Sequence, residues 1–277
     1  MKKILVTTDF SVNSKAAMRF AIQFASQGDI ALTFLHVQHI IRMTSWNEAT
    51  YAAYEKGEVA KVRKTLDNFV DSVYKSLKIN PTNHRCVIEN SPFVDSTIMG
   101  YAADGIFDYI CISARGAGMM EKLFGTTTAN LVGQSSVPVI AVPGNYRATK
   151  LTTVLYASDL SSLGTQLTRV IGFAKPVCAT VELLHFSTPF EPVTDPEIIC
   201  MAVQKYTDYP VTVHLQPRDF DTTLTADIES VITAQNPSLV IMFTTRKDGF
   251  FDRLFLSSNS VDCSFLTTAP LLVFSNV

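Results

Sequence analysis

The sequence predicts an α/β protein built from two doubly wound units, each with a five-stranded parallel sheet. Three observations point to this fold: a length of 277 residues, apolar strands that alternate with helical segments, and motifs that occur twice in the same order. A chain of this length exceeds the roughly 100–200 residues of most single domains. Strands written as continuous apolar runs and separated by helices indicate parallel sheets with both faces covered.

The motifs that occur twice form four pairs of blocks. The pairs are KILVTTDFS (3–11) with TVLYASDLS (153–161), LTFLHV (32–37) with VELLHF (181–186), DYICISARGAGMMEKLF (108–124) with LVIMFTTRKDGFFDRLF (239–255), and VPVIAV (137–142) with APLLVF (269–274). Asp9 thus corresponds to Asp159. Internal repeats at a nearly constant offset predict a tandem duplication. We expect domains at residues 1–146 and 147–277, because a Pro- and Gly-containing segment separates the blocks there.

Each element of the first half follows from a local pattern. The predicted strands are residues 3–8, 31–37, 84–89, 107–113 and 137–142, and the predicted helices are 11–27, 47–77, 93–105 and 126–136. Residues 11–27 carry Phe20 and Phe24 among alanines at helical spacing. Segment 47–77 is long enough for one long helix or for two. The second half repeats this order, with residues 195–208 as a shorter version of that segment.

The composition narrows the class of protein. A hydrophobic fraction of 47%, a charged fraction of 17% and a net charge of −2 predict a compact chain with buried strands. No Lys/Arg cluster stands out and the pI is about 6.2, so nucleic acid is not an expected partner. The N-terminus has only a four-residue apolar run, too short for a signal peptide or a membrane span, so we expect a cytoplasmic protein without membrane partners.

The cysteines are not spaced as metal ligands are. The five are Cys86, Cys111, Cys178, Cys200 and Cys263. Their odd number and wide spread favour reduced, mostly buried side chains over a disulfide framework or a metal site.

Function is expected where parallel strands end. In doubly wound sheets, ligands bind beyond the carboxyl ends of the strands, at the point where strand order reverses. This rule selects the loops at residues 7–11, 36–38 and 113–128. The third loop combines glycines with a helix start, where backbone N–H groups can approach a phosphate. It matches neither the Walker spacing nor the dinucleotide G-x-G-x-x-G, and alone a structural turn is the commoner explanation.

The chain resembles the universal stress protein family, in its tandem two-domain form, along nearly its whole length. The motifs that carry the resemblance are VTTDFS (6–11), LHV (35–37), ARGAG…LFGTT (114–127) and VPVIAVP (137–143). It implies the doubly wound fold in its adenine nucleotide alpha hydrolase-like, Rossmann-like form and a non-catalytic role in the stress response. It also implies that the two repeats pair through their last strands as a pseudo-dimer within one chain; a homodimer is a further option.

The family's nucleotide-binding motif is only partly present. Such members carry Gly-x2-Gly-x9-Gly followed by Ser or Thr. Here Ser113 replaces the first glycine, and only eight residues separate Gly116 from Gly125. The resemblance implies that ATP or AMP binds the first domain, with no metal beyond a nucleotide-associated Mg²⁺. The implied contacts are Thr8, Asp9 and the backbone at Val37 for the adenosine part, and Gly116, Gly118, Gly125, Thr126 and Thr127 for the phosphates.

For Asp9 and His36, a structural role is an alternative to a functional one. Asp9 can accept hydrogen bonds from adenosine, or it can cap the helix that follows it, and the sequence favours neither. His36 lies in an apolar strand, where a core histidine with satisfied hydrogen bonds is favoured over a catalytic base.

The second half departs further from the motif. The aligned counterparts of Ser113 and Gly116 are Thr244 and Lys247, and Ser257-Ser258 replaces the Gly-Thr pair. Lys247, Asp248 and the pair Phe250-Phe251 would crowd a phosphate, so we expect no nucleotide here. In RKDGFFDRLF, packing of Phe251, Leu254 and Phe255 onto the sheet is favoured over an interaction surface.

Three classes of function follow. The first is a non-catalytic stress-response protein that binds ATP or AMP in its first domain, with at most weak ATPase activity. The second is an enzyme of this fold, but the chain lacks S-G-G-x-D-S, H-x-G-H and G-x-S-x-G. The third is an adaptor or structural protein that binds no nucleotide. The role of segment 40–77, as a lid over the first-domain site or in assembly, stays open.

Overall fold

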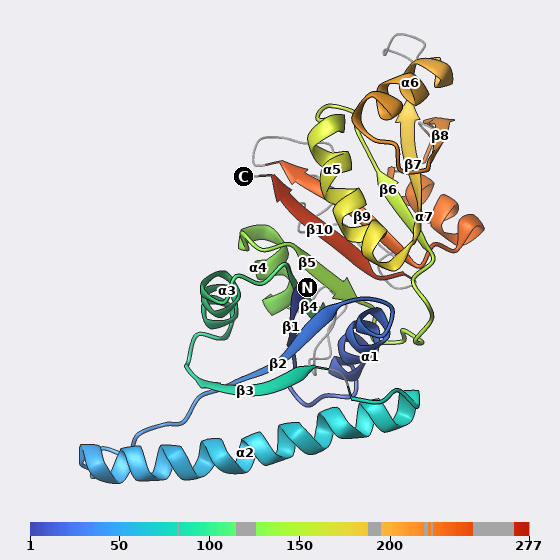
Figure 1. Ribbon diagram of the computed structural model, residues 1–277. Helices are drawn as coiled ribbons and strands as arrows, with labels where there is room; N and C mark the ends of the chain where they lie inside the picture. Colours follow the sequence, from blue (N-terminus) through green and yellow to red (C-terminus); the bar gives the residue numbers. More distant parts are fainter. Residues whose placement is uncertain are drawn as a thin grey trace.

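Ten strands form one continuous sheet in the computed structural model, which describes residues 1–81, 83–114, 126–187, 195–218, 221–222, 224–245 and 269–276 (Figure 1). The order is β3-β2-β1-β4-β5-β10-β9-β6-β7-β8. The strands are β1 Lys2–Thr7, β2 Ile30–Gln38, β3 His84–Asn90, β4 Tyr109–Ser113, β5 Val139–Val142, β6 Thr153–Ala157, β7 Thr180–Ser187, β8 Val211–Pro217, β9 Leu239–Thr245 and β10 Leu271–Asn276. Each half contributes five strands, and each half reverses its strand order beside its first strand, as predicted for doubly wound units.

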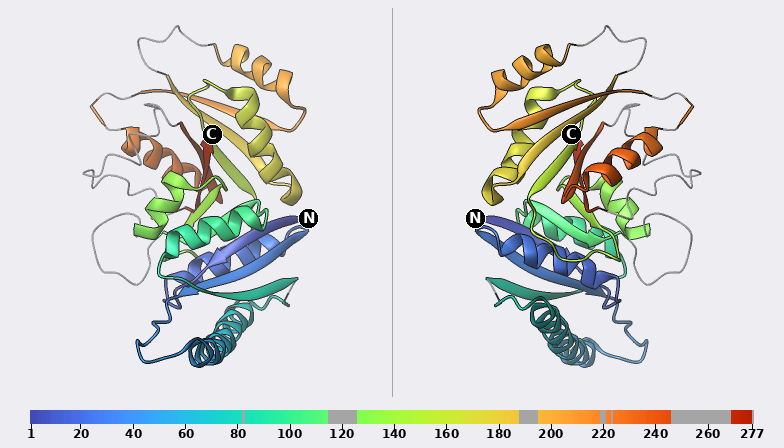
Figure 2. Two further views of the ribbon diagram at one scale, coloured as in Figure 1. Left: turned by 90° about the vertical axis from the view of Figure 1, so that its left-hand side faces the viewer. Right: turned by 90° about the vertical axis from the view of Figure 1, so that its right-hand side faces the viewer.

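Helices cover both faces of the sheet (Figure 2). They are α1 Ser14–Ala25, α2 Glu48–Leu77, α3 Val94–Asp104, α4 Thr126–Gln134, α5 Leu163–Ala174, α6 Pro196–Tyr206 and α7 Leu224–Gln235, with a short 3₁₀ helix at Lys175–Val177. One core packs α1, α2, α5 and α6 against the sheet, and a second packs α3, α4 and α7 against the opposite face. Every described residue of β4 and β5 is buried, which explains their unbroken apolar sequences. Of the two options for segment 47–77, the single long helix is correct, because α2 runs unbroken through Gly57.

The two halves join edge to edge through β5 and β10. This pair is antiparallel, with Ile140 opposite Leu272, whereas the other neighbouring strands of the described sheet run parallel. It is the intramolecular pairing that the family resemblance implies. Helix packing reinforces the junction: the rings of Phe24 on α1 and Phe173 on α5 stack with centroids 4.9 Å apart.

A side-chain amide ties the segment between the halves to the turn that follows α1. The Gln27 side chain donates to the Leu151 carbonyl at 3.0 Å, and its oxygen accepts from the Leu151 N–H at 2.8 Å. One amide thus satisfies both backbone groups of a buried residue outside any strand.

The strand registers test the alignment of the two halves. Leu5 pairs with Ile110 in the first half, and Leu155 pairs with Val240 in the second. Since Leu155 corresponds to Leu5, Val240 corresponds to Ile110. The sequence alignment placed Asp108 over Leu239, which is one residue out of register for this strand. The counterpart of Ser113 is therefore Phe243 and not Thr244, whereas the ladders confirm the other three block pairs.

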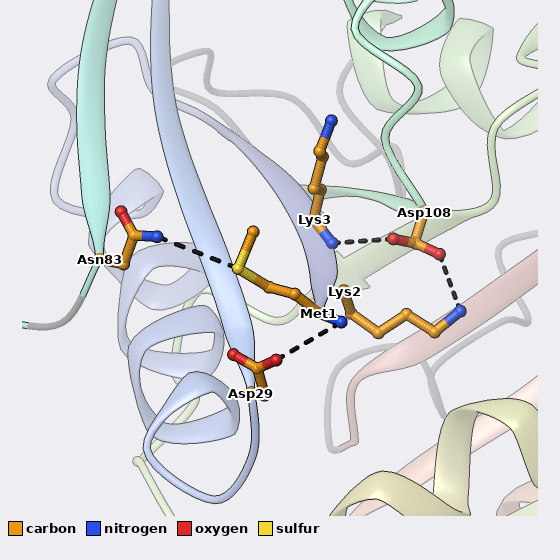
Figure 3. A network of polar contacts seen from close by, with 6 residues as sticks. All are labelled: Met1, Lys2, Lys3, Asp29, Asn83 and Asp108. Atoms are coloured by element: carbon orange, nitrogen blue, oxygen red, sulfur yellow. Dashed lines mark hydrogen bonds and ion pairs between the residues drawn. The ribbon is translucent and has the colours of Figure 1, made fainter.

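The amino edge of the sheet shows the same correspondence. In the first half, the Asp108 carboxylate accepts from the Lys3 backbone N–H at 2.8 Å and pairs with the Lys2 ammonium at 2.7 Å (Figure 3). In the second half, the Ser238 hydroxyl accepts from the Thr153 N–H at 3.4 Å. Both residues fix the start of a central strand, and Ser238 therefore takes the place of Asp108.

Within the residues that the structure describes, no helix has the length and apolar character of a membrane span.

We predict that the seam between β5 and β10 contributes strongly to stability. Ile140 has no exposed surface and pairs with Leu272 of β10 on one side and Cys111 of β4 on the other, so Ile140→Ala should lower the free energy of unfolding by about 2–5 kcal/mol. Ile41→Ala, at a position 71% exposed, should change it by less than about 0.5 kcal/mol. Urea denaturation of both variants measures this, and equal losses would contradict the seam's role.

A second prediction concerns thiol reactivity. Burial, with the Asp67 carboxylate beside it, raises the pKa of the Cys86 thiol to about 12, and burial likewise raises the pKa of the Cys111 thiol. Cys178 is exposed. Since the thiolate is the nucleophile, iodoacetamide at pH 8 should label Cys178 in the native protein and label Cys86 and Cys111 only after denaturation.

Peptide mass spectrometry of labelled protein reads each cysteine separately, and a Cys178→Ser variant identifies background labelling. Native labelling of Cys111 at the rate of Cys178 would contradict the buried placement. The fifth cysteine, Cys263, lies outside the described residues.

Candidate functional site

The candidate site lies at the carboxyl edge of the first half, where β1 is flanked by β2 and β4. The Val6–Cys111 pairing sets the ends of β1 and β4 side by side, and α4 begins shortly after β4 in the chain. Of the predicted contacts, Thr8, Asp9, Val37, Thr126 and Thr127 come to this edge on neighbouring elements. The predicted phosphate contacts Gly116, Gly118 and Gly125 lie outside the described residues.

The turn after β1 is held by its own hydrogen bonds. The Phe10 N–H donates to the Thr8 hydroxyl at 3.1 Å, and the Ser11 N–H donates to the Asp9 carboxylate at 2.9 Å. Phe10 sits at φ 62°, in the left-handed region that a bulky residue rarely adopts. Such a conformation persists only where the surroundings fix it.

Two rings from other elements pack against Phe10 and hold it in this conformation. The Phe10 ring lies 4.4 Å from the His36 ring of β2 and 5.5 Å, edge to face, from the Phe69 ring of α2, measured between centroids. The carboxyl-terminal half of α2, which buries Leu66 and Val70, therefore packs directly onto the turn that carries Asp9.

Thr8 is engaged inside the protein. Its side chain is 8% exposed, and its hydroxyl shares a 2.8 Å hydrogen bond with the Ser14 hydroxyl at the start of α1. The Ser14 N–H in turn donates to the Ser11 hydroxyl. Thr8 thus links the end of β1 to the first turn of α1, a role that its place in the motif did not reveal.

Asp9 is exposed, and its carboxylate closes the turn. Of the two alternatives for this residue, the structural one takes a different form from a helix cap. The carboxylate accepts from Ser11, three residues before α1 begins at Ser14, and stabilises an Asx turn. The prediction that Asp9 contacts adenosine stays a prediction.

His36 is hydrogen-bonded within the fold, as the sequence favoured, but its side chain is partly exposed and does not lie in the core. Its Nδ1 lies 2.8 Å from the Thr8 carbonyl oxygen. A carbonyl oxygen can only accept, so Nδ1 carries the proton and the imidazole ties the end of β2 to the end of β1.

The second half reproduces this turn. The His185 Nδ1 lies 2.9 Å from the Ser158 carbonyl oxygen, and Leu160 sits at φ 62° with its N–H donating to the Ser158 hydroxyl. The Ser161 N–H donates to the Asp159 carboxylate at 3.0 Å. The shared motif D-[FL]-S was the sequence signal for this geometry, although it did not reveal the left-handed residue.

The start of α4 is fastened to the end of β4. The Thr128 hydroxyl donates to the Ser113 carbonyl at 2.9 Å and is buried. Thr126 is exposed and Thr127 partly exposed, so the first turn of the helix presents hydroxyls at the surface of this edge. Sequence reasoning named Thr126 and Thr127 and missed the anchoring role of Thr128.

No metal centre stands in the part of the chain that the structure describes: no three His, Cys, Asp or Glu side chains are grouped to hold an ion.

Known proteins share this architecture. The sequence model of the universal stress protein family matches residues 1–143. No curated protein matches the chain. A solved universal stress protein from Archaeoglobus fulgidus DSM 4304 is 16% identical, with TM-score 0.70, over 99% of this chain and 98% of that one.

Two other solved structures are less similar. A protein from Pseudomonas aeruginosa UCBPP-PA14, described as a universal stress protein, is 13% identical with TM-score 0.56 over 99% of this chain and 93% of that chain. A universal stress protein solved in complex with cAMP is 15% identical, with TM-score 0.38, over 53% of this chain and 98% of that one.

The full-length likenesses show that other proteins share the arrangement of two joined halves, and the family's sequence model covers more than half of the present chain. Its family model match covers residues 1–143, and its two doubly wound halves join through their last strands; the chain belongs to the universal stress protein family.

Proposed function

We propose that the protein is a non-catalytic stress-response protein that binds ATP or AMP at the carboxyl edge of its first half. The observation that carries the proposal is the juxtaposition of the Asp9 turn with the first turn of α4 across neighbouring strands. A carboxylate on one side suits the hydroxyl and amino groups of adenosine. A helix start with exposed hydroxyls on the other side suits phosphate.

In the proposed complex, the adenosine part meets Asp9 and the backbone at Val37. The phosphates lie against Thr126 and Thr127 and the glycines Gly116, Gly118 and Gly125, with a Mg²⁺ ion carried by the nucleotide. The proposed site only binds the nucleotide and performs no reaction on it, so no residue is assigned a catalytic role.

The second half, for which we keep the limits 147–277, acts in this proposal as a structural partner. Phe243 stands where the first half has Ser113, is buried, and stacks on Phe274 with centroids 4.9 Å apart. A large ring in the core replaces a small residue at the strand end. This supports a second half devoted to the joint sheet and not to a nucleotide.

One observation favours the alternative, an adaptor without a nucleotide. The Asp9 turn and the Asp159 turn make the same hydrogen bonds, although the second half lacks the glycine motif. A turn kept without the motif serves folding, and Asp9 would then serve folding as well.

The first test asks whether nucleotide binds. We expect purified protein, once denatured, to release ATP or AMP, and emptied protein to give heat on titration with either. Gly125→Glu places a carboxylate among the proposed phosphate contacts and should weaken binding at least about 50-fold by charge repulsion. Absence of bound nucleotide and of heat would leave the adaptor as the function, and unchanged affinity in Gly125→Glu would place the site elsewhere.

The second test uses the repeat as its own control. Asp9→Ala and Asp159→Ala each remove a carboxylate that closes the same turn, so each should cost about 0.5–1.5 kcal/mol of unfolding free energy. Only Asp9→Ala should weaken nucleotide binding, by about tenfold, as measured by titration calorimetry. Equal, small effects of both variants on affinity would show that Asp9 acts in folding alone.

A further inference from the structure

The residues on both sides of Asp9 are held by contacts from other elements. Before it, the Thr8 N–H donates to the Leu35 carbonyl at 3.0 Å, and the Thr8 carbonyl accepts from the His36 ring at 2.8 Å. After it, Phe10 occupies the left-handed region at φ 62°. A bulky residue there costs conformational free energy, and such residues cluster at ligand-binding turns. The direction of the Asp9 side chain therefore depends on how firmly Phe10 is held.

Phe69 is the residue of α2 whose ring holds Phe10. The two rings meet edge to face, with centroids 5.5 Å apart and planes at 85°. The Lys15 ammonium, in the first turn of α1, lies 4.8 Å from the centroid of the Phe69 ring. Both kinds of contact are attractive. Phe69 thus contacts the turn that carries Asp9 and also the helix that follows this turn.

The part of α2 that carries Phe69 is anchored in the core. The buried residues of this helix are Leu66, Val70, Val73 and Tyr74, which lie on either side of Phe69 along the chain. Packed interiors deform little. The ring of Phe69 is therefore presented to the turn from a fixed position.

The second half forms the same turn without a ring at this position. Leu160 takes the place of Phe10 and has the same φ of 62°. It packs against the core and donates its N–H to the Ser158 hydroxyl. Hydrogen bonds and a packed apolar side chain are therefore enough to form the turn. The ring contacts of Phe10 add rigidity, and they occur in the half for which nucleotide binding is proposed.

We propose that Phe69 is a positioning residue of this nucleotide site: it holds Phe10, and through Phe10 it keeps the Asp9 carboxylate directed toward adenosine. The inference rests on the nucleotide binding proposed above. When the binding geometry is populated only part of the time, the apparent affinity falls by that fraction. Removal of the Phe69 ring leaves the turn formed but less often in the binding geometry, so affinity falls although no ligand contact is removed.

Titration calorimetry of the emptied full chain with ATP and with AMP tests this role. Phe69→Ala should weaken binding of the nucleotide that the wild type binds by at least about threefold, the factor expected for loss of an aromatic pair. Phe10→Leu copies the residue of the second half, so it should fold and lose affinity to a similar extent. Phe69→Tyr keeps the ring and should restore affinity to within about twofold of the wild type.

A matched control separates the turn from the rest of the core. Phe24→Leu also removes a ring contact of α1, the stack on Phe173 of α5, but away from the turn. It should lower the thermal unfolding temperature and change affinity less than about twofold, because distant sites contribute independently.

A double variant distinguishes positioning from general destabilisation. If Phe69 acts through Asp9, Phe69→Ala should weaken binding by less than about 1.5-fold in an Asp9→Ala background, whereas a merely structural effect would lower affinity by the same factor in both backgrounds. Amide hydrogen exchange without nucleotide reads the turn directly. Phe69→Ala should speed exchange of the Ser11 N–H, which donates to Asp9, and leave that of the Ser161 N–H, which donates to Asp159, unchanged.

The outcomes separate the two proposals. Absence of nucleotide binding by the wild-type chain would overturn the nucleotide site and the positioning role together. If the wild type binds, three results would each overturn the positioning role alone: a loss below threefold in Phe69→Ala, equal losses in the two backgrounds, or unchanged exchange at Ser11.

Discussion

The antiparallel contact between β5 and β10 is the interaction on which the rest of the molecule depends. Each half alone would leave its last strand as an open edge, whereas all of β5 and residues 271–274 of β10 are buried here. An open apolar edge is a site of aggregation, and pairing removes it from both halves at once. The pairing also lines up the helices of the two halves, so that α1 and α5 pack through Phe24 and Phe173 into one shared core. The fold of each half is thus completed by the other.

The turn after the first strand shows how one local design is used twice. In both halves a histidine donates to a carbonyl oxygen of the turn, and a hydroxyl accepts from the N–H of the residue in the left-handed region. An aspartate carboxylate then accepts from the N–H of the serine two residues further on. The first half adds the rings of Phe10 and Phe69, which connect the turn to α2. This connection gives α2 a physical contact with the edge where nucleotide is proposed to bind. Its amino-terminal half instead meets the end of β3, where the Asn90 amide donates to Tyr51 and Glu55.

Much of this could be predicted from the sequence, for reasons that individual elements make clear. The strands were predictable because fully buried parallel strands are continuous apolar runs. The correspondence of His36 with His185 was predictable because polar residues are rare in such runs. The register of β9 was not, because a slide by one residue along Val240, Ile241 and Met242 leaves every position apolar. Phe10 gave no sign of its left-handed backbone, since contacts from distant elements impose it. The buried hydroxyl of Thr8 and the contact between α2 and the end of β3 likewise depend on the placement of α1 and α2 in space.

The direction of the strands has a consequence for how the protein meets other molecules. Because β5 and β10 run in opposite directions while each half is parallel within itself, the strands of the first half end at one margin of the sheet and those of the second half end at the opposite margin. A ligand at the end of β1 and a ligand at the end of β6 would therefore bind at opposite margins of the sheet. Molecules bound at the two margins would be separated by the β5–β10 pair and by the shared core that α1 and α5 form through Phe24 and Phe173.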